Sequence, residues 1–246
     1  MSTETPDTPN APSIAGHRVA VILTAYNEAP RIGATLAALA VAFPGAPVWV
    51  ADDGSTDATP VLARQAGARV VRSERMIGKG GAATAAAWDA LQDAGVTERG
   101  RNQELIFVLC DADLGSSALE LGALADALRR GETDIAVAAF ATRVGGGVGL
   151  AVAFARWAIR RRCGLSLRAP ISGQRALRAD VLADVLPFAA GFGMEIGMTI
   201  DAVRSGHRVA EIELDLSHRA TGRTLSGFLH RGRQLVDFVR VYFARR

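Results

Sequence analysis

Residues 105–113 read LIFVLCDAD, six apolar residues followed by two aspartates with one alanine between them. A short apolar run of this kind is typical of a strand buried on both faces of a parallel sheet. Two earlier stretches have the same design, in which residues 18–23 lead into TAYNE (24–28) and residues 48–51 lead into DDGSTD (52–57). We therefore expect three buried strands, each ending in polar residues.

Helical periodicity separates these strands. Strands are expected at 18–23, 48–51, 68–71, 105–110 and 134–140. Helices are expected at 28–42, from Thr56 or Asp57 to 67, at 81–93, and from Ser116 or Ser117 to 130. The named residues are expected to cap the helices that they begin. Alternating strands and helices predict an α/β fold with a mostly parallel central sheet and helices on both faces. Ligands of such sheets bind outside the carboxyl ends of the strands, where the three polar motifs lie.

The second half of the sequence is less regular. It predicts a helix at 150–162, a loop at 169–175, a helix at 191–205, a strand at 208–216 and an amphipathic helix with a basic face at 225–243. This last helix either packs its apolar stripe on the domain or lies on an anionic membrane.

Length and composition fit one large domain. The chain has 246 residues, of which 49% are hydrophobic and 22% charged, so a sizeable core is expected and global disorder is excluded. No uncharged apolar run reaches the roughly 18 residues of a membrane span. Residues 1–16 predict a disordered tail without the basic start of a signal peptide. Two cysteines, Cys110 and Cys163, fit a reducing compartment, which predicts a cytoplasmic protein.

Charge is distributed unevenly along the chain. The first 139 residues carry 11 basic and 17 acidic residues, whereas the remainder carries 17 basic and 8 acidic residues. This asymmetry suggests a metal site in the first half and an anionic partner for the second, and it is also compatible with ordinary surface charge. Of the 28 basic residues only Lys79 is a lysine, which draws attention to it.

The two aspartates after residues 105–110 predict a cation site. Strand alternation places Asp111 and Asp113 on one side, where their carboxylates can share one hard cation such as Mg²⁺ or Mn²⁺. Such a cation neutralises charge on a diphosphate leaving group. An acidic turn that caps a helix is the structural alternative.

Two further motifs have chemistry suited to a nucleotide. Asp52, Asp53 and Asp57 can accept hydrogen bonds from a nucleobase or ribose, although Asp-Gly-Ser is also common in ordinary turns. Gly78-Lys79-Gly80-Gly81 opens a helix, so its backbone N–H groups and the lysine can contact an anion. The spacing of a P-loop is absent, and no dinucleotide-type glycine motif follows the first strand.

Taken together, the four strings resemble the family 2 glycosyltransferases, which share a nucleotide-diphospho-sugar-binding fold of the GT-A type. The resemblance covers roughly residues 18–140. It implies a nucleotide-sugar-binding half at 17–140 and an acceptor half at 141–246 within one domain, and it implies that Mg²⁺ or Mn²⁺ binds Asp111 and Asp113. The donor-binding residues that it implies are Thr24, Ala25, Tyr26, Asn27, Glu28, Asp52, Asp53, Gly78, Lys79 and Asp111.

The second half is similar to two branches of this family. Residues 172–175 and 219–224 resemble polyprenyl-phosphate transferases such as dolichol-phosphate mannose synthases, whereas residues 145–147, 191–197 and 218–219 resemble glucosyl-3-phosphoglycerate synthases. The glycine run continues as Val148-Gly149-Leu150, where the second branch has arginine and threonine. The branches differ in stereochemistry, and the sequence favours neither.

The resemblance also assigns roles in the second half. His218 is expected as a third metal ligand beside the aspartates, Asp113 as a catalytic residue, and Glu195 as a general base or a carboxylate that orients the acceptor. The expected acceptor-binding residues are Gly146, Gly147, Ser172, Gly173, Gln174, Arg175, Arg219 and Arg223, whose arginines could clamp a phosphate.

These observations predict a metal-dependent glycosyltransferase that moves one sugar from a nucleotide-diphospho-sugar to a phosphate-bearing acceptor, either a polyprenyl phosphate or a small phosphorylated acid. The alternatives are a nucleotidyltransferase on a similar fold and a non-catalytic protein that binds nucleotide-sugars. No nucleic-acid partner is expected. Peripheral contact with the inner face of the membrane and association into a homodimer are left open.

Overall fold

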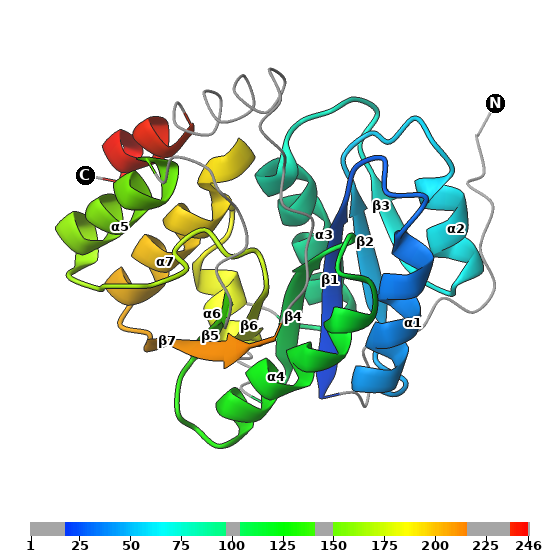
Figure 1. Cartoon of the computed structure of the whole chain (residues 1–246), viewed down its shortest axis with the longest axis horizontal. Coiled ribbons are helices and arrows are strands. Elements are labelled where there is room, and N and C mark those ends of the chain that lie inside the picture. Colours follow the sequence, from blue (N-terminus) through cyan, green and yellow to red (C-terminus); the bar gives the residue numbers. More distant parts are fainter. Residues whose placement is uncertain (1–17, 97–103, 141–149, 216–236, 246) are drawn as a thin grey trace.

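A computed structural model describes residues 18–96, 104–140, 150–215 and 237–245. It contains one seven-stranded sheet in the order β3-β2-β1-β4-β6-β5-β7, flanked by helices (Figure 1). The strands are β1 (Val19–Ala25), β2 (Val48–Asp52), β3 (Arg69–Arg72), β4 (Ile106–Asp111), β5 (Ile135–Phe140), β6 (Arg175–Arg178) and β7 (Val209–Leu214). The predicted α/β class is confirmed.

Helices connect the strands, most of them near the predicted positions, whereas the helix at 179–184 was not predicted. They are α1 (Ile32–Ala42), α2 (Thr59–Gln65), α3 (Lys79–Asp93), α4 (Gly122–Arg129), α5 (Leu150–Cys163), α6 (Ala179–Asp184) and α7 (Met194–Arg204), with 3₁₀ turns at Gly115–Leu121 and Gly191–Gly193. Residues 237–244 are also helical. No helix in the described part of the chain is long and apolar enough to cross a bilayer.

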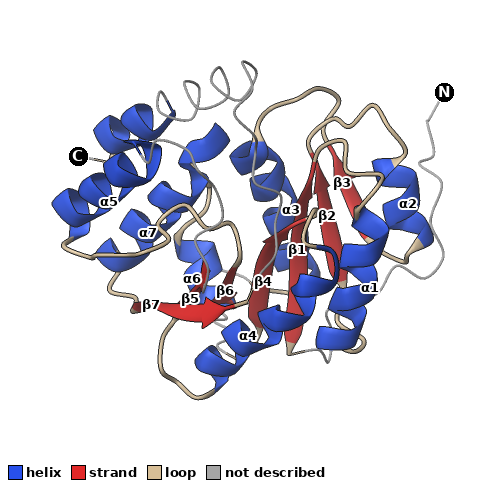
Figure 2. Ribbon diagram, viewed as in Figure 1, coloured by secondary structure: helices blue, strands red, loops and turns tan. Residues whose placement is uncertain are grey.

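The sheet is mostly parallel. Strands β1, β2, β3 and β4 pair in parallel with their neighbours, as do β5 and β7, and only β6 runs antiparallel to the strands on its two sides. Because β5 lies in the predicted donor half whereas β6 and β7 lie in the predicted acceptor half, one continuous sheet joins the two halves (Figure 2).

Alternation of side chains along each strand builds a core on both faces of the sheet. Val21 and Leu23 of β1 pack with α1 and α4 on one face, whereas Ala20 and Ile22 pack with α3 on the other. A third cluster joins α5, α7 and the terminal helix through Ile159, Ile196 and Phe238. The prediction of helices on both faces is therefore confirmed.

Two details of the sequence-based assignment were wrong. The predicted loop at 169–175 is confirmed for residues 169–174, but strand β6, which begins at Arg175, was not predicted, because it is four residues long with an arginine at each end and lacks an apolar run. The predicted serine caps also differ, because a 3₁₀ turn precedes α4. The N-cap of this turn is Leu114, which makes no side-chain cap hydrogen bond. Gly115, whose φ is 55°, makes this tight entry.

The predicted cap of α2 is formed in part. The helix begins at Thr59 after Ala58, later than expected. Asp57 nevertheless accepts a hydrogen bond from the Thr59 backbone N–H at 2.9 Å, so its carboxylate satisfies one of the free N–H groups of the first turn.

Candidate active site

The polar motifs meet at the carboxyl ends of three adjacent strands. In the β1–β4 register Thr24 pairs with Asp111, and in the β1–β2 register Ala25 pairs with Asp52. The strands converge on this edge in Figure 1, with the loops after β1, β2 and β4 beside one another. The expectation that these three motifs share one edge is confirmed.

Asp111 is surrounded by three hydrogen-bond donors. Its Oδ1 accepts from the Thr24 hydroxyl at 2.8 Å and lies 2.7 Å from Lys79 Nζ, while its Oδ2 accepts from Gln174 Nε2 at 2.9 Å. Burial alone would raise the pKa of Asp111, but the charge and hydrogen bond of Lys79, helped by Thr24 and Gln174, lower it. The carboxylate is thus held ionised, and its side chain is still one-third exposed.

Lys79 bridges Asp111 and Glu195. Its Nζ lies 2.9 Å from Glu195 Oε1 in addition to its contact with Asp111. Burial would lower the pKa of Lys79, but the two carboxylates hold it above its usual range, so the ammonium stays charged. The lysine of the glycine loop therefore connects the end of β4 to the first turn of α7.

The loop before β6 closes over this ion pair. A Cβ atom on Gly173 would lie 2.5 Å from Lys79 Nζ and 2.7 Å from Asp111 Oδ2, so the chain can approach this closely only because residue 173 is glycine. Gln174, next in the chain, is buried and donates its hydrogen bond to Asp111. Residues expected on the acceptor side thus lie directly against the expected metal site.

Arg175 lies beneath this loop instead of facing solvent. It is fully buried, and its guanidinium donates to the carbonyls of Ser172 and Pro170 and to the Thr199 hydroxyl, at 2.9, 3.1 and 2.9 Å. Burial lowers the pKa of Arg175 to about 10, opposed by the charges of Glu195 and Glu211. Its guanidinium holds the loop from within, which differs from the expected clamp on an acceptor phosphate.

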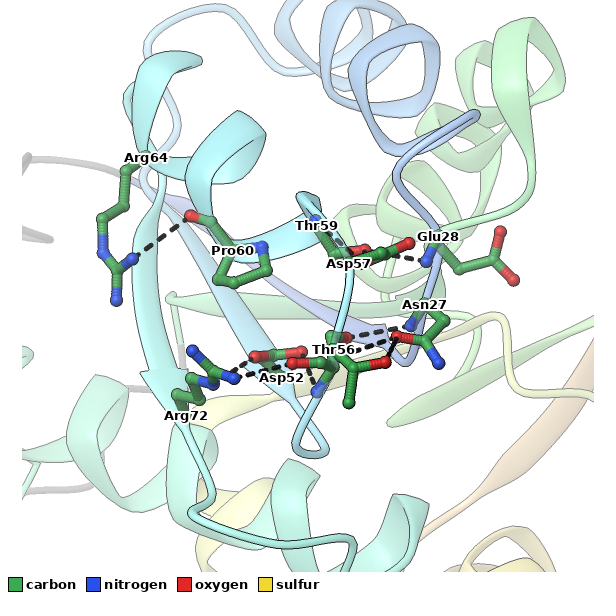
Figure 3. Close-up of polar contacts among 10 residues, drawn as sticks. Asn27, Glu28, Asp52, Thr56, Asp57, Thr59, Pro60, Arg64 and Arg72 are labelled. Carbon is green, nitrogen blue, oxygen red and sulfur yellow. Dashed lines mark hydrogen bonds and ion pairs between the residues drawn. The ribbon is translucent and has the colours of Figure 1, made fainter.

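The expected nucleotide-binding aspartates take part in hydrogen bonds that shape the loops. Asp53 accepts from the backbone N–H groups of Ile77 and Gly78 at 2.7 and 3.0 Å, and burial raises its pKa despite these bonds. Asp52 is fully buried, accepts from the Ser55 N–H, and lies 3.2 Å from Arg72 Nε (Figure 3).

The loops after β1 and β2 are tied to each other. Asn27, in a left-handed conformation, donates its backbone N–H to the Ser55 hydroxyl, and its Oδ1 accepts from the Thr56 N–H at 2.8 Å (Figure 3). The Glu28 N–H donates to the Thr59 hydroxyl at 2.8 Å. These contacts fix the loops, while Tyr26 remains 42% exposed and accessible to a ligand.

Asp113 and Glu28 concentrate negative charge at the same edge. Burial raises the pKa of Glu28, Arg31 opposes this, and the charge of Asp113 raises it further, so the two carboxylates are close enough to repel each other. The described residues hold no group of three metal ligands. Asp111 and Asp113 supply the hard oxygen ligands that Mg²⁺ and Mn²⁺ prefer, and a cation beside them would relieve this repulsion.

Several expected residues lie outside the described part of the chain, among them Gly146, Gly147, His218, Arg219 and Arg223. The network around Lys79 was not foreseen from the sequence. Motif order places Lys79, Gln174 and Glu195 near the site, but no spacing rule connects residues 79, 111 and 195.

Comparison with known proteins gives a consistent result. Residues 20–186 match glycosyl transferase family 2. The chain is 31% identical over 212 residues to the glucosyl-3-phosphoglycerate synthase of Mycolicibacterium paratuberculosis. This alignment covers 76% of this chain and 60% of that protein. It is 30% identical over 223 residues to the undecaprenyl-phosphate mannosyltransferase of Micrococcus luteus, covering 84% and 86% respectively.

Solved structures resemble the fold over almost the whole chain. Glucosyl-3-phosphoglycerate synthase from Mycobacterium tuberculosis, in complex with Mn²⁺, UDP-glucose and glycerol 3-phosphate, superposes with a TM-score of 0.68 at 28% identity. The match covers 94% of this chain and 81% of that one. The same enzyme with Mg²⁺ and UDP gives a TM-score of 0.69. The chain thus spans about 60% of the length of its synthase relatives by sequence and most of the solved chain by structure.

Proposed function

The chain belongs to glycosyl transferase family 2, and from this premise we propose that it moves one sugar from a nucleotide-diphospho-sugar to a phosphate-bearing acceptor with the help of Mg²⁺ or Mn²⁺. The observation that carries the proposal is the cluster at the end of β4, where Lys79 lies within hydrogen-bond distance of both Asp111 and Glu195. Relatives named for phosphorylated acceptors of both kinds support the choice of acceptor class.

Asp111 and Asp113 are the residues that would hold the cation, with His218 as a further proposed ligand. When bound, the cation supplies positive charge to the diphosphate leaving group. The protein's own contribution is orientation: Thr24, Gln174 and Lys79 hold the Asp111 carboxylate in one position. Tyr26, Asn27 and Glu28 are proposed to surround the nucleoside, with the buried Asp52 holding the loop behind them.

Glu195 is proposed to act on the acceptor side. It is buried in the first turn of α7 and accepts a hydrogen bond from Lys79. An acceptor phosphate is already ionised near neutral pH, so it needs no strong base, and Glu195 is proposed to orient the acceptor through the Lys79 ammonium that it contacts. Arg219 and Arg223 are the proposed phosphate contacts.

The donor half can be tested by thermal shift. We expect a nucleotide-diphospho-sugar to raise the melting temperature in the presence of Mn²⁺ and to lose this effect in Asp113→Asn. Asp126→Asn is the matched control, because Asp126 lies on α4 with a half-exposed side chain. A shift that Mn²⁺ does not affect would contradict the metal assignment. Release of the nucleoside diphosphate with sugar transfer separates this function from a nucleotidyltransferase and from a non-catalytic binding protein.

The acceptor half requires kinetics with two acceptors. Wild type, Arg219→Ala and Arg223→Ala are assayed with a polyprenyl phosphate and with a soluble phosphorylated acid. Removal of a guanidinium that binds phosphate should raise the acceptor KM more than the donor KM, and the loss should shrink as salt rises. Activity on neutral acceptors only, with both variants unchanged, would exclude a phosphate-bearing acceptor.

A cytoplasmic location is proposed from two free cysteines, which fit a reducing compartment. Contact of the C-terminal helix with a membrane and formation of a homodimer remain proposals. In the described part of this helix, Phe238 and Val241 are buried against α5 and α7. The apolar stripe there is therefore engaged by the domain, and any membrane contact must use another face.

A further inference from the structure

Helix α5 and the terminal helix present a cluster of four aromatic rings, which we call the aromatic face: Phe154, Trp157, Tyr242 and Phe243. The ring centroids of Trp157 and Tyr242 lie 4.8 Å apart, those of Phe154 and Trp157 5.5 Å, and those of Tyr242 and Phe243 5.3 Å. Trp157 and Phe243 are nevertheless 48% and 52% exposed. Clustered exposed apolar side chains mark interaction sites more often than single ones do.

The aromatic face rests on a rigid base. Beneath it, Phe238 and Val241 are buried with Ile159 of α5. Arg162 donates to the Tyr242 carbonyl at 2.8 Å, and its guanidinium lies 3.8 Å from the centroid of the Tyr242 ring. Gly193 allows the terminal helix to pack closely, since a Cβ on Gly193 would lie 2.1 Å from Val241 Cγ2. The exposed rings therefore belong to a packed helix pair.

Positive charge surrounds these rings. Arg160 and Arg161 follow Trp157 by three and four positions on α5, which places them on its side of the helix, and both are exposed. Neither forms an ion pair with any residue that the structure describes. Arg240 of the terminal helix is 78% exposed, with a loose contact of 3.7 Å to Asp237. Helix α5 contains no acidic residue.

We propose that the aromatic face, with Arg160, Arg161 and Arg240 around it, docks on the surface of an anionic lipid bilayer. Tryptophan and tyrosine favour the boundary between acyl chains and headgroups, and each basic residue near an anionic surface strengthens the attraction to it. A second copy of the chain fits less well, because a two-fold interface places like arginines near each other. Docking needs neither donor nor acceptor, so the proposal goes beyond the transfer reaction.

Fluorescence of Trp157 reports the contact directly. The chain has three tryptophans, of which Trp49 is fully buried and Trp88 is 50% exposed on α3. In Trp88→Phe, Trp157 is the exposed reporter. Vesicles containing phosphatidylglycerol should shift its emission to the blue and brominated lipids should quench it, whereas pure phosphatidylcholine vesicles and high salt should abolish both effects.

Charge reversal tests the surface with a matched control. Arg160→Glu/Arg161→Glu should weaken sedimentation with the anionic vesicles at least ~10-fold. Arg129→Glu/Arg130→Glu at the end of α4 changes the net charge equally at two exposed positions and should bind as wild type does. Trp157→Ala/Phe243→Ala should also lose binding while circular dichroism stays unchanged.

Three outcomes would overturn the proposal. The first is no binding of the wild type to anionic vesicles at low salt. The second is an equal loss in the two charge-reversal variants, because that would mean only a general attraction. The third is a concentration-dependent dimer that the Trp157→Ala/Phe243→Ala variant abolishes, because the face would then join two copies of the chain.

Discussion

Lys79 Nζ lies 2.7 Å from Asp111 Oδ1 and thereby connects the glycine loop before α3 to the end of β4. The same ammonium reaches Glu195 at 2.9 Å, so a single cation links residues from three separate parts of the chain. The only lysine of the sequence thus stands between two carboxylates. Contact with donor phosphates remains a prediction, and the structure adds a second route by which Lys79 affects the donor, through Asp111.

Lys79→Met should lower the free energy of unfolding by about 2 kcal/mol, because it leaves two partly buried carboxylates without their cation. Urea unfolding measures this. The loss should be smaller in a Glu195→Gln background, since one of the two charges is then already removed. Equal losses in both backgrounds would mean that Lys79 and Glu195 are not coupled.

Donor affinity separates the two routes. If Lys79 acts through Asp111, Lys79→Met should weaken binding of the nucleotide-diphospho-sugar in wild type and have little further effect in Asp111→Asn. If it contacts the phosphates directly, the losses of the two substitutions should add. Calorimetry with a nucleoside diphosphate and Mn²⁺ distinguishes the two results.

Arg175→Met should destabilise the protein by about 3 kcal/mol, since it leaves the Ser172 and Pro170 carbonyls and the Thr199 hydroxyl without their buried donor. Arg175→Lys should rescue only part of this, because an ammonium cannot reproduce three donors in one plane. We expect kcat to fall as the loop at 172–174 shifts. A rise in acceptor KM alone that disappears at high salt would instead support the interpretation that Arg175 binds the acceptor phosphate.

Acid should weaken the contact between β5 and β7 at Asp134. The hydrogen bonds of Arg208, with further help from the charges of Arg208 and Arg178, lower the pKa of Asp134 from 3.8 to about 2 against the opposing effect of burial. A carboxyl group whose pKa is lower in the folded protein than in the unfolded chain stabilises the fold at pH values above its unfolded pKa. This stabilisation is lost as the pH falls through its folded pKa. Wild type should therefore lose on the order of 1 kcal/mol between pH 4 and pH 2 at this site.

The matched variant for this pH effect is Asp134→Asn. It should be less stable than wild type at pH 7 and should show a smaller drop in unfolding free energy on acidification. Denaturant titrations at pH 7, 4 and 2 provide the comparison. An identical pH profile for the two proteins would refute the assignment.

Two helical glycines should respond oppositely to alanine. A Cβ on Gly80 of α3 would lie 1.9 Å from the Ala189 carbonyl oxygen, so Gly80→Ala must displace backbone and should destabilise the protein by more than ~1 kcal/mol. Gly33 of α1 has nothing within 4 Å of the same position, so Gly33→Ala should stabilise by about 0.5–1 kcal/mol. Thermal unfolding of both variants tests whether α3 packs as closely on residues 189–191 as described.

The sequence predicted the donor side of the fold well, because its signals are local. Each of the strands β1, β2 and β4 is an apolar run next to a polar motif, and parallel strands bring the motifs that follow them to one edge. Periodicity alone therefore placed Thr24, Asp52 and Asp111 together. Strand β6 was missed, because a four-residue segment with an arginine at each end becomes a strand only when β4 and β5 offer partners on both sides.

Sequence by itself determined which residues lie at the carboxyl edge of the sheet, since hydrophobic period and turn chemistry depend on near neighbours in the chain. Tertiary structure decided what those residues touch. Lys79, Asp111 and Glu195 are separated by 32 and 84 positions, and their meeting depends on α3, β4 and α7 packing around one sheet. Burial likewise decided the role of Arg175, because a fully buried guanidinium that donates to three acceptors inside the fold is not accessible to a ligand.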